Sequence, residues 1–203
     1  MKVSARRGII AAVAALSLTL SACGGGAQNA EEASLDTPLK VGALAVPAGE
    51  MLTHVADELA EKEGINVEFV EFNDYNTPNP ALSDGSIDAN LFQHQDFLDT
   101  YNEEAGGDLE SVGEIYLPAA AFHSKKYKSL DELPDGAVVS IPNDPTNEGR
   151  ALELLQEAGA IKIEDGATKP DGITENKKNF KFQEVDNASL PRTLEDDDAA
   201  FVT

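Results

Sequence analysis

The sequence contains one cysteine and no tryptophan among its 203 residues, and only 15 basic side chains against 37 acidic ones. A single cysteine excludes an internal disulfide bond, and one cysteine with three histidines provides no ligand set for a structural zinc ion, so we expect no metal site. Proteins bind nucleic acids mainly through Lys and Arg side chains that displace counterions from phosphates. A formal net charge of -22, with no basic patch beyond the amino terminus, therefore excludes DNA and RNA as partners.

Short motifs of enzymes are also missing. The sequence has no GxSxG nucleophile elbow, no HExxH zinc motif, no GxxxxGK[ST] phosphate loop and no glycine-rich dinucleotide fingerprint. We therefore expect no catalytic residues, no cofactor and no enzymatic activity. The 41% hydrophobic content is enough for a core, and the length suits one or two α/β units.

The amino terminus has the pattern of an export signal. A basic start is followed by the apolar run Gly8–Leu20, which is too short to span a bilayer comfortably, and then by LSAC, which ends at Cys23. This arrangement resembles the lipobox of bacterial lipoproteins, which implies that residues 1–22 are a signal peptide and that Cys23 carries acyl chains. The alternative is a cleaved secretory signal with an incidental free cysteine. Residues 23–38 have little apolar periodicity and are predicted to be a flexible tether, so we expect a lipid-anchored protein at the cell membrane, facing outside the cytoplasm.

Strand and helix patterns alternate after Pro38, which predicts an α/β fold with parallel strand pairs. Strands are expected at residues 39–46, 65–72, 87–92, 112–117, 137–141, 180–185 and from 199 onward. Helices are expected from 51 to the cap Gly64, at 77–82, at 94–104, and from about 146 to the cap Gly159, while 164–179 reads as a surface loop. We assign residues 39–117 to a first lobe and 118–203 to a second. Because the last residues read as a strand that has just begun, we expect the second lobe to be incomplete and its C-terminal part to be missing from this sequence.

The segment SIPNDPTNEGRAL contains the first candidate site. A strand is expected to end at Pro142, small polar capping residues follow, and the first turns of the next helix carry Arg150. A helix N-terminus beside a guanidinium suits a small anion such as a carboxylate. The alternative is that the polar residues only cap the helix and that Arg150 is a surface charge.

The segment DANLFQHQDFL contains the second candidate site. Phe92 and His94 lie at a predicted strand-to-helix junction, where open α/β sheets bind their ligands. The alternative is that Phe92 belongs to the core and that His94 only starts a helix. The acidic triplet Asp196 to Asp198 is predicted to be a solvated turn rather than a cation site, because adjacent side chains point in different directions.

The chain also resembles a known family, the NlpA-type lipoproteins, which are methionine-binding components of ABC importers. The resemblance runs from about Leu39 to Thr203 in the segments LKVGALAVP, VEFNDYNTPNPALSDGSIDANLFQH, SKKYKSLDELPDGA, SIPNDPTNEGRAL and LPRTLEDDDAA. It implies a periplasmic-binding-protein fold of type 2, with two α/β lobes and the ligand between them.

The resemblance also implies a set of ligand-binding residues. Arg150 matches the arginine that binds the carboxylate of the amino acid, and Asn147 belongs to the same segment. Phe92 and His94 match the aromatic residue and the histidine that contact the ligand, and Tyr75 is a weaker match. The implied function is capture of methionine, most simply the L form, and delivery to an ABC permease.

The sequence departs from the family pattern at three places. It has PAGE where relatives read PHAE, NLFQHQDFL where they read NYFQHKPYL, and Tyr116 and His123 where they have His and Tyr. These positions leave the carboxylate contact unchanged and bear on the side chain that the site prefers. A carrier for another amino acid or a dipeptide is therefore an alternative, and a surface adhesin or scaffold is a second one.

Overall fold

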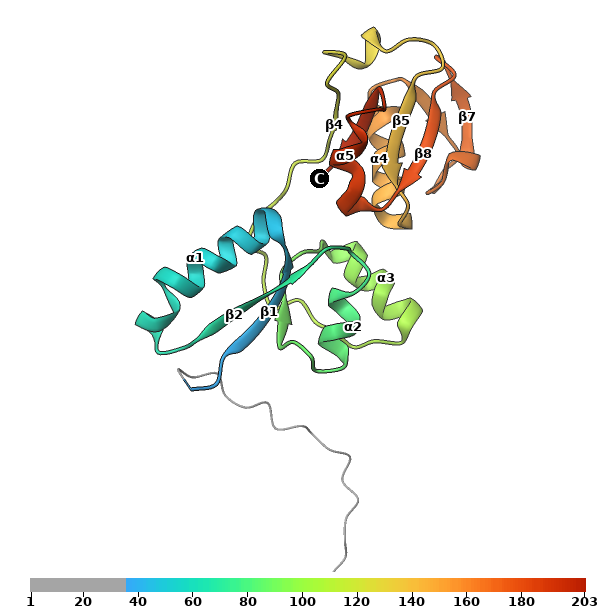
Figure 1. Cartoon of the computed structure of the whole chain (residues 1–203). Helices are drawn as coiled ribbons and strands as arrows, with labels where there is room; N and C mark the ends of the chain where they lie inside the picture. Colours follow the sequence, from blue (N-terminus) through green and yellow to red (C-terminus); the bar gives the residue numbers. More distant parts are fainter. Residues whose placement is uncertain (1–35) are drawn as a thin grey trace, which may run out of the picture. The chain divides into compact units, whose positions relative to one another are not determined.

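The computed structural model describes residues 36–203, which form a mixed α/β fold (Figure 1). The predicted signal peptide and Cys23 lie outside these residues, so the lipidation stays a prediction. None of the helices in the described residues is long and apolar enough to cross a membrane.

The first sheet has the strand order β2-β1-β3 and is entirely parallel. Its strands are β1 (Leu39–Leu44), β2 (Val67–Phe72) and β3 (Ala89–Asn90). In the central strand β1 the consecutive residues Val41, Gly42 and Ala43 are all buried, and α1 packs against β2. The predicted β-α-β opening with a parallel pair is therefore confirmed.

The second sheet has the order β4-β9-β5-β8, with β5 parallel to both of its neighbours and β4 antiparallel to β9. Its strands are β4 (Ala121–His123), β5 (Val138–Pro142), β8 (Lys181–Val185) and β9 (Ala199–Val202). A separate antiparallel pair consists of β6 (Ile161–Ile163) and β7 (Ile173–Asn176).

Glycine and proline residues help to explain where the helices begin and end. They are α1 (Glu50–Glu58), α2 (Pro78–Ser83), α3 (Gln95–Ala105), α4 (Pro145–Glu157) and α5 (Leu190–Thr193), with short turns at Ala45–Gly49, Ala60–Glu63, Leu130–Glu132, Pro170–Gly172 and Asn187–Ser189. Gly64 follows the turn after α1 with φ +75°, a left-handed conformation that glycine adopts at no steric cost. Proline stands in the first turn of α2 and α4, where its missing N–H group is not needed.

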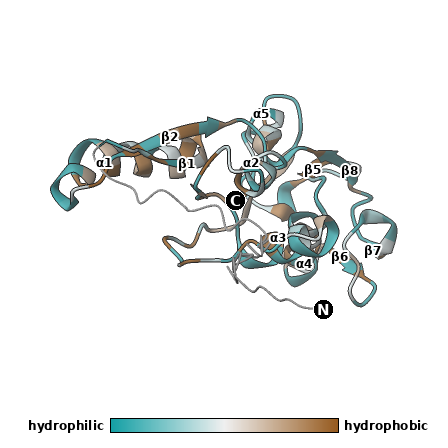
Figure 2. Cartoon of the chain, turned by 90° about the horizontal axis from the view of Figure 1, so that it is seen from below, coloured by the Kyte–Doolittle hydropathy of each residue, from teal (hydrophilic) through white to brown (hydrophobic). Residues whose placement is uncertain are grey.

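Two apolar clusters form the core. In the larger one, Val139 and Ile141 of β5 pack with Leu152 and Leu155 of α4 and with Phe201 of β9, and all five are completely buried. The smaller one lies between β1, β2 and α1, where Figure 2 shows apolar residues along these elements. Because α4 packs on β5 through the larger cluster, the first turn of α4 is held at the carboxyl end of β5.

Two predicted elements are wrong. The expected strand at 112–117 has no backbone partner among the described residues, and its apolar side chains Val112, Ile115 and Leu117 are exposed. A strand exists only where another backbone pairs with it, and an apolar pattern alone does not supply this partner. The expected loop at 164–179 instead contains β7, which pairs with β6 and turns Ile173 toward the larger core cluster.

Three boundaries also differ from the prediction. The helix that follows β1 ends at Glu58 and continues as a tighter turn over Ala60–Glu63. The first strand ends at Leu44, and the strand expected at 87–92 is reduced to Ala89–Asn90. The division of the chain into lobes at residue 118 stays a prediction.

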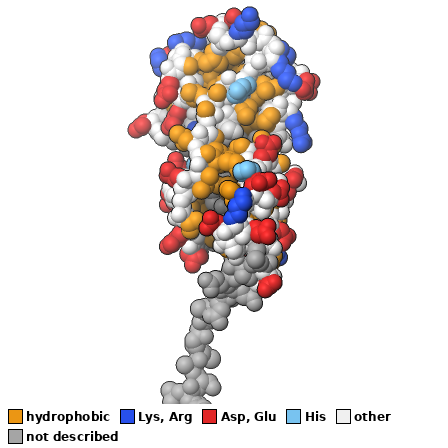
Figure 3. All heavy atoms as spheres, turned by 90° about the vertical axis from the view of Figure 1, so that its left-hand side faces the viewer, with side chains coloured by type: hydrophobic (Ala, Val, Ile, Leu, Met, Phe, Trp, Pro, Cys, Tyr) orange, Lys and Arg blue, Asp and Glu red, His pale blue; other side chains and the backbone are white. Residues whose placement is uncertain are grey.

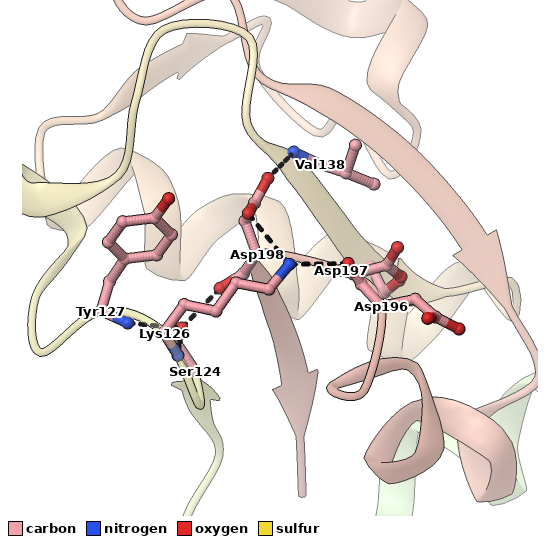
Figure 4. A network of polar contacts seen from close by, with 8 residues as sticks. Ser124, Lys126, Tyr127, Val138, Asp196, Asp197 and Asp198 are labelled. Atoms are coloured by element: carbon pink, nitrogen blue, oxygen red, sulfur yellow. Dashed lines mark hydrogen bonds and ion pairs between the residues drawn. The ribbon is translucent and has the colours of Figure 1, made fainter.

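Only Asp196 of the acidic triplet is exposed in a turn, so the predicted solvated turn is wrong for Asp197 and Asp198. Asp197 is buried and accepts a hydrogen bond from Ser140, while the Asp198 carboxylate accepts the backbone N–H of Val138 at 2.9 Å. Figure 4 shows the Lys126 ammonium between the carboxylate of Asp198, at 3.3 Å, and the backbone oxygen of Asp196, at 2.7 Å. The triplet therefore fastens the start of β9 to β5 and to the turn after β4.

Replacing Asp198 by Ala should lower the free energy of unfolding by about 1–3 kcal/mol, because the Val138 amide loses its acceptor and Lys126 loses its ion pair. Urea denaturation measures this change. The matched control is Asp196→Ala, which removes an exposed carboxylate and should change stability by less than about 0.5 kcal/mol. Equal effects of the two substitutions would contradict this assignment.

Candidate functional site

The candidate anion site lies at the junction of β5 and α4, as predicted. β5 ends at Pro142, and Asp144 is the N-cap of α4. One oxygen of its carboxylate accepts the backbone N–H of Asn147 at 2.9 Å and the hydroxyl of Thr146 at 2.8 Å. Asp144 is one of the capping residues that the sequence suggests, and it marks the start of α4.

The Asn147 side chain links several polar groups at this junction. It is 1% exposed, and its amide nitrogen donates to both oxygens of Asp144, at 3.1 and 3.2 Å. Its oxygen Oδ1 accepts a hydrogen bond from Nη1 of Arg150 at 2.9 Å and lies 3.1 Å from Nε2 of His94. The donor and acceptor sides of this one carboxamide are therefore both used.

The contacts of His94 determine its tautomer. His94 is the N-cap of α3, and its Nδ1 atom accepts the backbone N–H of Phe97 at 3.3 Å. Nδ1 therefore carries no proton, so Nε2 carries it and donates to Asn147 Oδ1. Burial lowers the pKa of His94, the bond to Asn147 opposes this shift, and the positive charge of Arg150 lowers the pKa further. The ring is therefore neutral at neutral pH.

Aromatic rings form a wall beside His94. The ring centroids of Tyr75 and Phe92 are 5.8 Å apart, those of Phe92 and Phe97 5.8 Å, and those of Tyr75 and Phe97 6.2 Å, all in edge-to-face geometry. His94 joins them with its ring 6.2 Å from that of Phe97. Burial raises the pKa of Tyr75. Such a group of rings provides apolar contact area for a side chain of a ligand.

A group of amides that the sequence did not reveal supports this wall. Asn79 of α2 is 1% exposed and exchanges two hydrogen bonds of 2.8 Å with Gln93, the residue between Phe92 and His94. The Asn90 amide donates to the same Asn79 oxygen at 2.9 Å. No spacing rule pairs residues of a short helix with a loop ten or more positions away, so only the fold could reveal this group.

Arg150 has no acidic partner among residues 36–203. The ion pairs of these residues are all formed by lysines, namely Lys125 with Glu195, Lys126 with Asp198 and Lys162 with Glu175. Arg150 is partly buried, and in the described residues its hydrogen bond goes to Asn147 from Nη1 alone. Its other N–H groups can therefore bind a carboxylate, and the ligand-binding role of Arg150 stays a prediction.

The first half of the described chain has few positive charges. Residues 39–117 contain only two basic side chains, Lys40 and Lys62, and on the face drawn in Figure 3 most Lys and Arg side chains lie on the upper part. A site that binds an anion in such a protein must supply its own positive charge. Arg150 does so, because the N-terminus of α4 already has the carboxylate of Asp144 as its cap.

A cavity of about 140 Å³ lies next to the aromatic wall. Tyr75 and Phe97 are among the residues that line it, as are Asp144 and Thr146. Neither His94 nor Arg150 lines it, so this cavity adjoins the cluster around Asn147 and is not the cluster itself.

Tyr116 and His123, two of the positions that depart from the family pattern, lie in different settings. Tyr116 packs against the smaller core cluster and lies close enough to Tyr75 to raise the pKa of that phenol, as a secondary cause after burial. His123 is exposed on β4. In residues 36–203 no three His, Cys, Asp or Glu side chains lie close enough together to hold a metal ion.

A family model described as NlpA lipoprotein matches residues 39–203, nearly all of the described chain. The chain belongs to the NlpA lipoprotein family. It is 48% identical over 193 residues to the D-methionine-binding lipoprotein MetQ of Salmonella typhi, an alignment that covers 92% of this chain and 68% of that protein.

Solved structures of other proteins show the same fold. This NlpA lipoprotein matches a nutrient-binding protein from Burkholderia cenocepacia, solved bound to methionine, with a TM-score of 0.77 and 46% identity over 81% of this chain and 71% of that one. It matches a periplasmic substrate-binding protein of an ABC transporter from Coxiella burnetii with a TM-score of 0.75 and 38% identity over 81% of this chain and 70% of that one. The predicted periplasmic-binding-protein fold is confirmed.

Glu148, the neighbour of Asn147, is an unusual feature of this NlpA lipoprotein. The side chain is completely buried, and neither carboxylate oxygen has a hydrogen-bond partner. Burial raises the pKa of Glu148 to about 7, and the negative charge of Glu184 on β8 acts in the same direction, while Lys169 opposes them. An ionised carboxylate without partners is costly in the interior, so the protonated form fits this position.

The stability of the protein should depend on pH through Glu148. Folding raises this pKa from 4.5 to about 7. Below pH 4.5 the carboxyl is protonated in both the folded and the unfolded protein, so it does not change the free energy of unfolding. Between pH 4.5 and about 7 the unfolded protein releases the proton more readily, so the free energy of unfolding falls as pH rises, and it levels off just above pH 7. Glu148→Gln keeps the shape and cannot ionise. We expect wild type and variant to be similarly stable at pH 4.5 and the variant to be more stable at pH 8.5, by up to about 3 kcal/mol.

Urea denaturation from pH 4.5 to 8.5 measures this difference, with Glu153→Gln, an exposed position on the same helix, as the control. A constant difference between wild type and Glu148→Gln across the range would show that Glu148 does not titrate there.

Proposed function

We propose that this protein is the lipid-anchored solute-binding component of an ABC importer and that it binds methionine and delivers it to the permease. It would be attached through acylated Cys23 to the cell membrane and face outside the cytoplasm. Its work is binding, with no chemical change to the ligand.

The observation that carries this proposal is the unpaired guanidinium of Arg150 beside the N-terminus of α4. Asn147 orients one edge of the guanidinium, and no carboxylate of the described residues neutralises it. A planar fork with free N–H groups binds a carboxylate in bidentate fashion. The α-carboxylate of an amino acid matches this geometry and charge.

The aromatic wall supports the choice of an apolar amino acid. Tyr75, Phe92 and Phe97 offer ring edges and faces, and a thioether packs well against aromatic rings. His94 joins the wall to Asn147 and so connects the apolar surface with the carboxylate site. The similar proteins from Salmonella typhi and Burkholderia cenocepacia, one described as D-methionine-binding and the other solved with methionine, agree with this ligand.

Delivery would follow ligand-dependent closure, the mechanism that two-lobed binding proteins use. His94 comes from α3 of the first half of the chain, whereas Asn147 and Arg150 come from α4 of the second half. A ligand that contacts both helices stabilises the form in which they are close, and the permease then recognises that form.

A second candidate is a carrier for a different amino acid or a dipeptide. It is favoured by Leu91, Gln95 and Asp96 in NLFQHQDFL, which depart from the family pattern beside Phe92 and His94. Competition among amino acids for the same site separates the two candidates. A scaffold or adhesin, the remaining alternative, would bind its partner equally well without Arg150.

Arg150→Gln should weaken methionine binding by about 30-fold to 3,000-fold, because the carboxylate of the ligand loses its charged partner. Isothermal titration calorimetry measures the change. Arg150→Lys keeps the charge but not the planar fork and should give an intermediate affinity. Arg192→Gln, an exposed arginine on α5, is the control and should bind as wild type does. Wild-type affinity in Arg150→Gln would contradict the proposal.

Phe92→Ala should reduce selectivity rather than abolish binding. Methionine should lose about 1–3 kcal/mol of affinity as the ring contact disappears, whereas alanine, which does not reach the wall, should lose little. Competition titrations with the two amino acids give the ratio. An equal loss for both would show that Phe92 supports the fold of the site and does not contact the side chain.

A further inference from the structure

Asp144 makes two kinds of contact: those of the capped turn, which include a hydrogen bond from the Thr146 hydroxyl at 2.8 Å, and those with the Asn147 side chain. Its Oδ1 atom accepts the Asn147 backbone N–H at 2.9 Å, which caps α4. Both of its oxygens also accept from the side-chain amide of Asn147, at 3.1 and 3.2 Å. A cap requires only the first contact, so the second remains to be explained.

The second contact determines which way the Asn147 carboxamide faces. With its NH₂ group on Asp144, its oxygen points at Arg150 and at Nε2 of His94, and both of these donate. In the flipped orientation the oxygen would face a carboxylate and the NH₂ group would face two donors. Both sides would then be repulsive, so the carboxylate of Asp144 selects one orientation.

The orientation of the Asn147 carboxamide determines the hydrogen bonds of both Arg150 and His94. The Asn147 oxygen holds Nη1 of Arg150 at 2.9 Å and requires the proton of His94 to lie on Nε2. The contact of His94 Nδ1 with the Phe97 N–H requires the same tautomer, so every hydrogen bond from Asp144 to Phe97 has one donor and one acceptor. The amide also separates the negative charge of Asp144 from the place where an anionic ligand would bind.

We propose that Asp144 is a positioning residue for ligand binding, which acts through the carboxamide of Asn147 to fix the guanidinium of Arg150 and the hydrogen bond of the His94 Nε2–H group before the ligand arrives. A site that is ordered in advance loses less conformational entropy on binding. This inference rests on the proposed function for its effect on affinity, but its effect on His94 exists without any ligand.

Asp144→Ser separates the two kinds of contact. The serine hydroxyl accepts the Asn147 backbone N–H and keeps the cap, but it offers no second oxygen to hold the side-chain amide. We expect a melting temperature within a few degrees of wild type and methionine binding weakened by about tenfold. Methioninamide, which lacks the carboxylate, should lose much less affinity. Asp165→Ser, at an exposed position in the loop after β6, is the control.

The hydrogen bond of the His94 Nε2–H group provides a readout that a purely structural cap would not change. In the ligand-free wild type this proton should exchange slowly with water, because the Asn147 oxygen accepts it, and in Asp144→Ser it should exchange faster, because the carboxamide no longer holds its oxygen toward His94. If the serine variant does not fold, Asp144→Asn replaces it, because it also caps the helix but presents one oxygen and one NH₂ group.

An unchanged exchange rate of the His94 Nε2–H proton together with unchanged methionine affinity in the folded variant would overturn the inference and leave Asp144 as a helix cap. If the wild type binds no methionine, the proposed function fails, and the exchange rate of this proton alone then decides: faster exchange in the variant supports the positioning role, and no change overturns it.

Discussion

The carboxamide of Asn147 is the contact on which the candidate site depends. Its oxygen accepts from His94 on α3 and from Arg150 on α4, and its nitrogen donates to the cap of α4. α4 is packed on β5 through the larger core cluster. The Asn147 side chain therefore fixes the position of His94, which adjoins the aromatic wall, relative to Arg150. A buried amide with both sides satisfied has a single low-energy orientation, so the site has a defined shape before a ligand binds.

Electrostatics explains why one arginine stands out in so acidic a chain. The lysines with ion pairs neutralise carboxylates on the surface, and exposed pairs of this kind contribute little to stability. Arg150 instead has no ion pair within residues 36–203, so its charge can attract an anion. The buried carboxyl of Glu148 on the same turn fits this setting only when it is neutral, because a second negative charge there would oppose an anionic ligand.

The parts of the structure that depend on local signals could be predicted from the sequence. Proline and a capping aspartate locate the start of α4 and thereby Arg150, and glycine marks the turn after α1. Contacts between distant residues could not be predicted. His94 and Asn147 are 53 positions apart, and the exchange between Asn79 and Gln93 depends on how α2 packs. The wrong strand at 112–117 and the missed β7 have the same origin, since a strand depends on the segment that pairs with it.

The central claim is that Arg150 binds the carboxylate of an amino acid whose side chain lies on the aromatic wall. A crystal structure of the unlabelled protein with selenomethionine as the ligand tests it most directly, because selenium gives an anomalous signal at the end of the side chain. The account predicts the selenium peak beside Tyr75 and Phe92 and the carboxylate of the ligand on Arg150. Selenium next to Arg150, or a ligand bound away from α3 and α4, would contradict it.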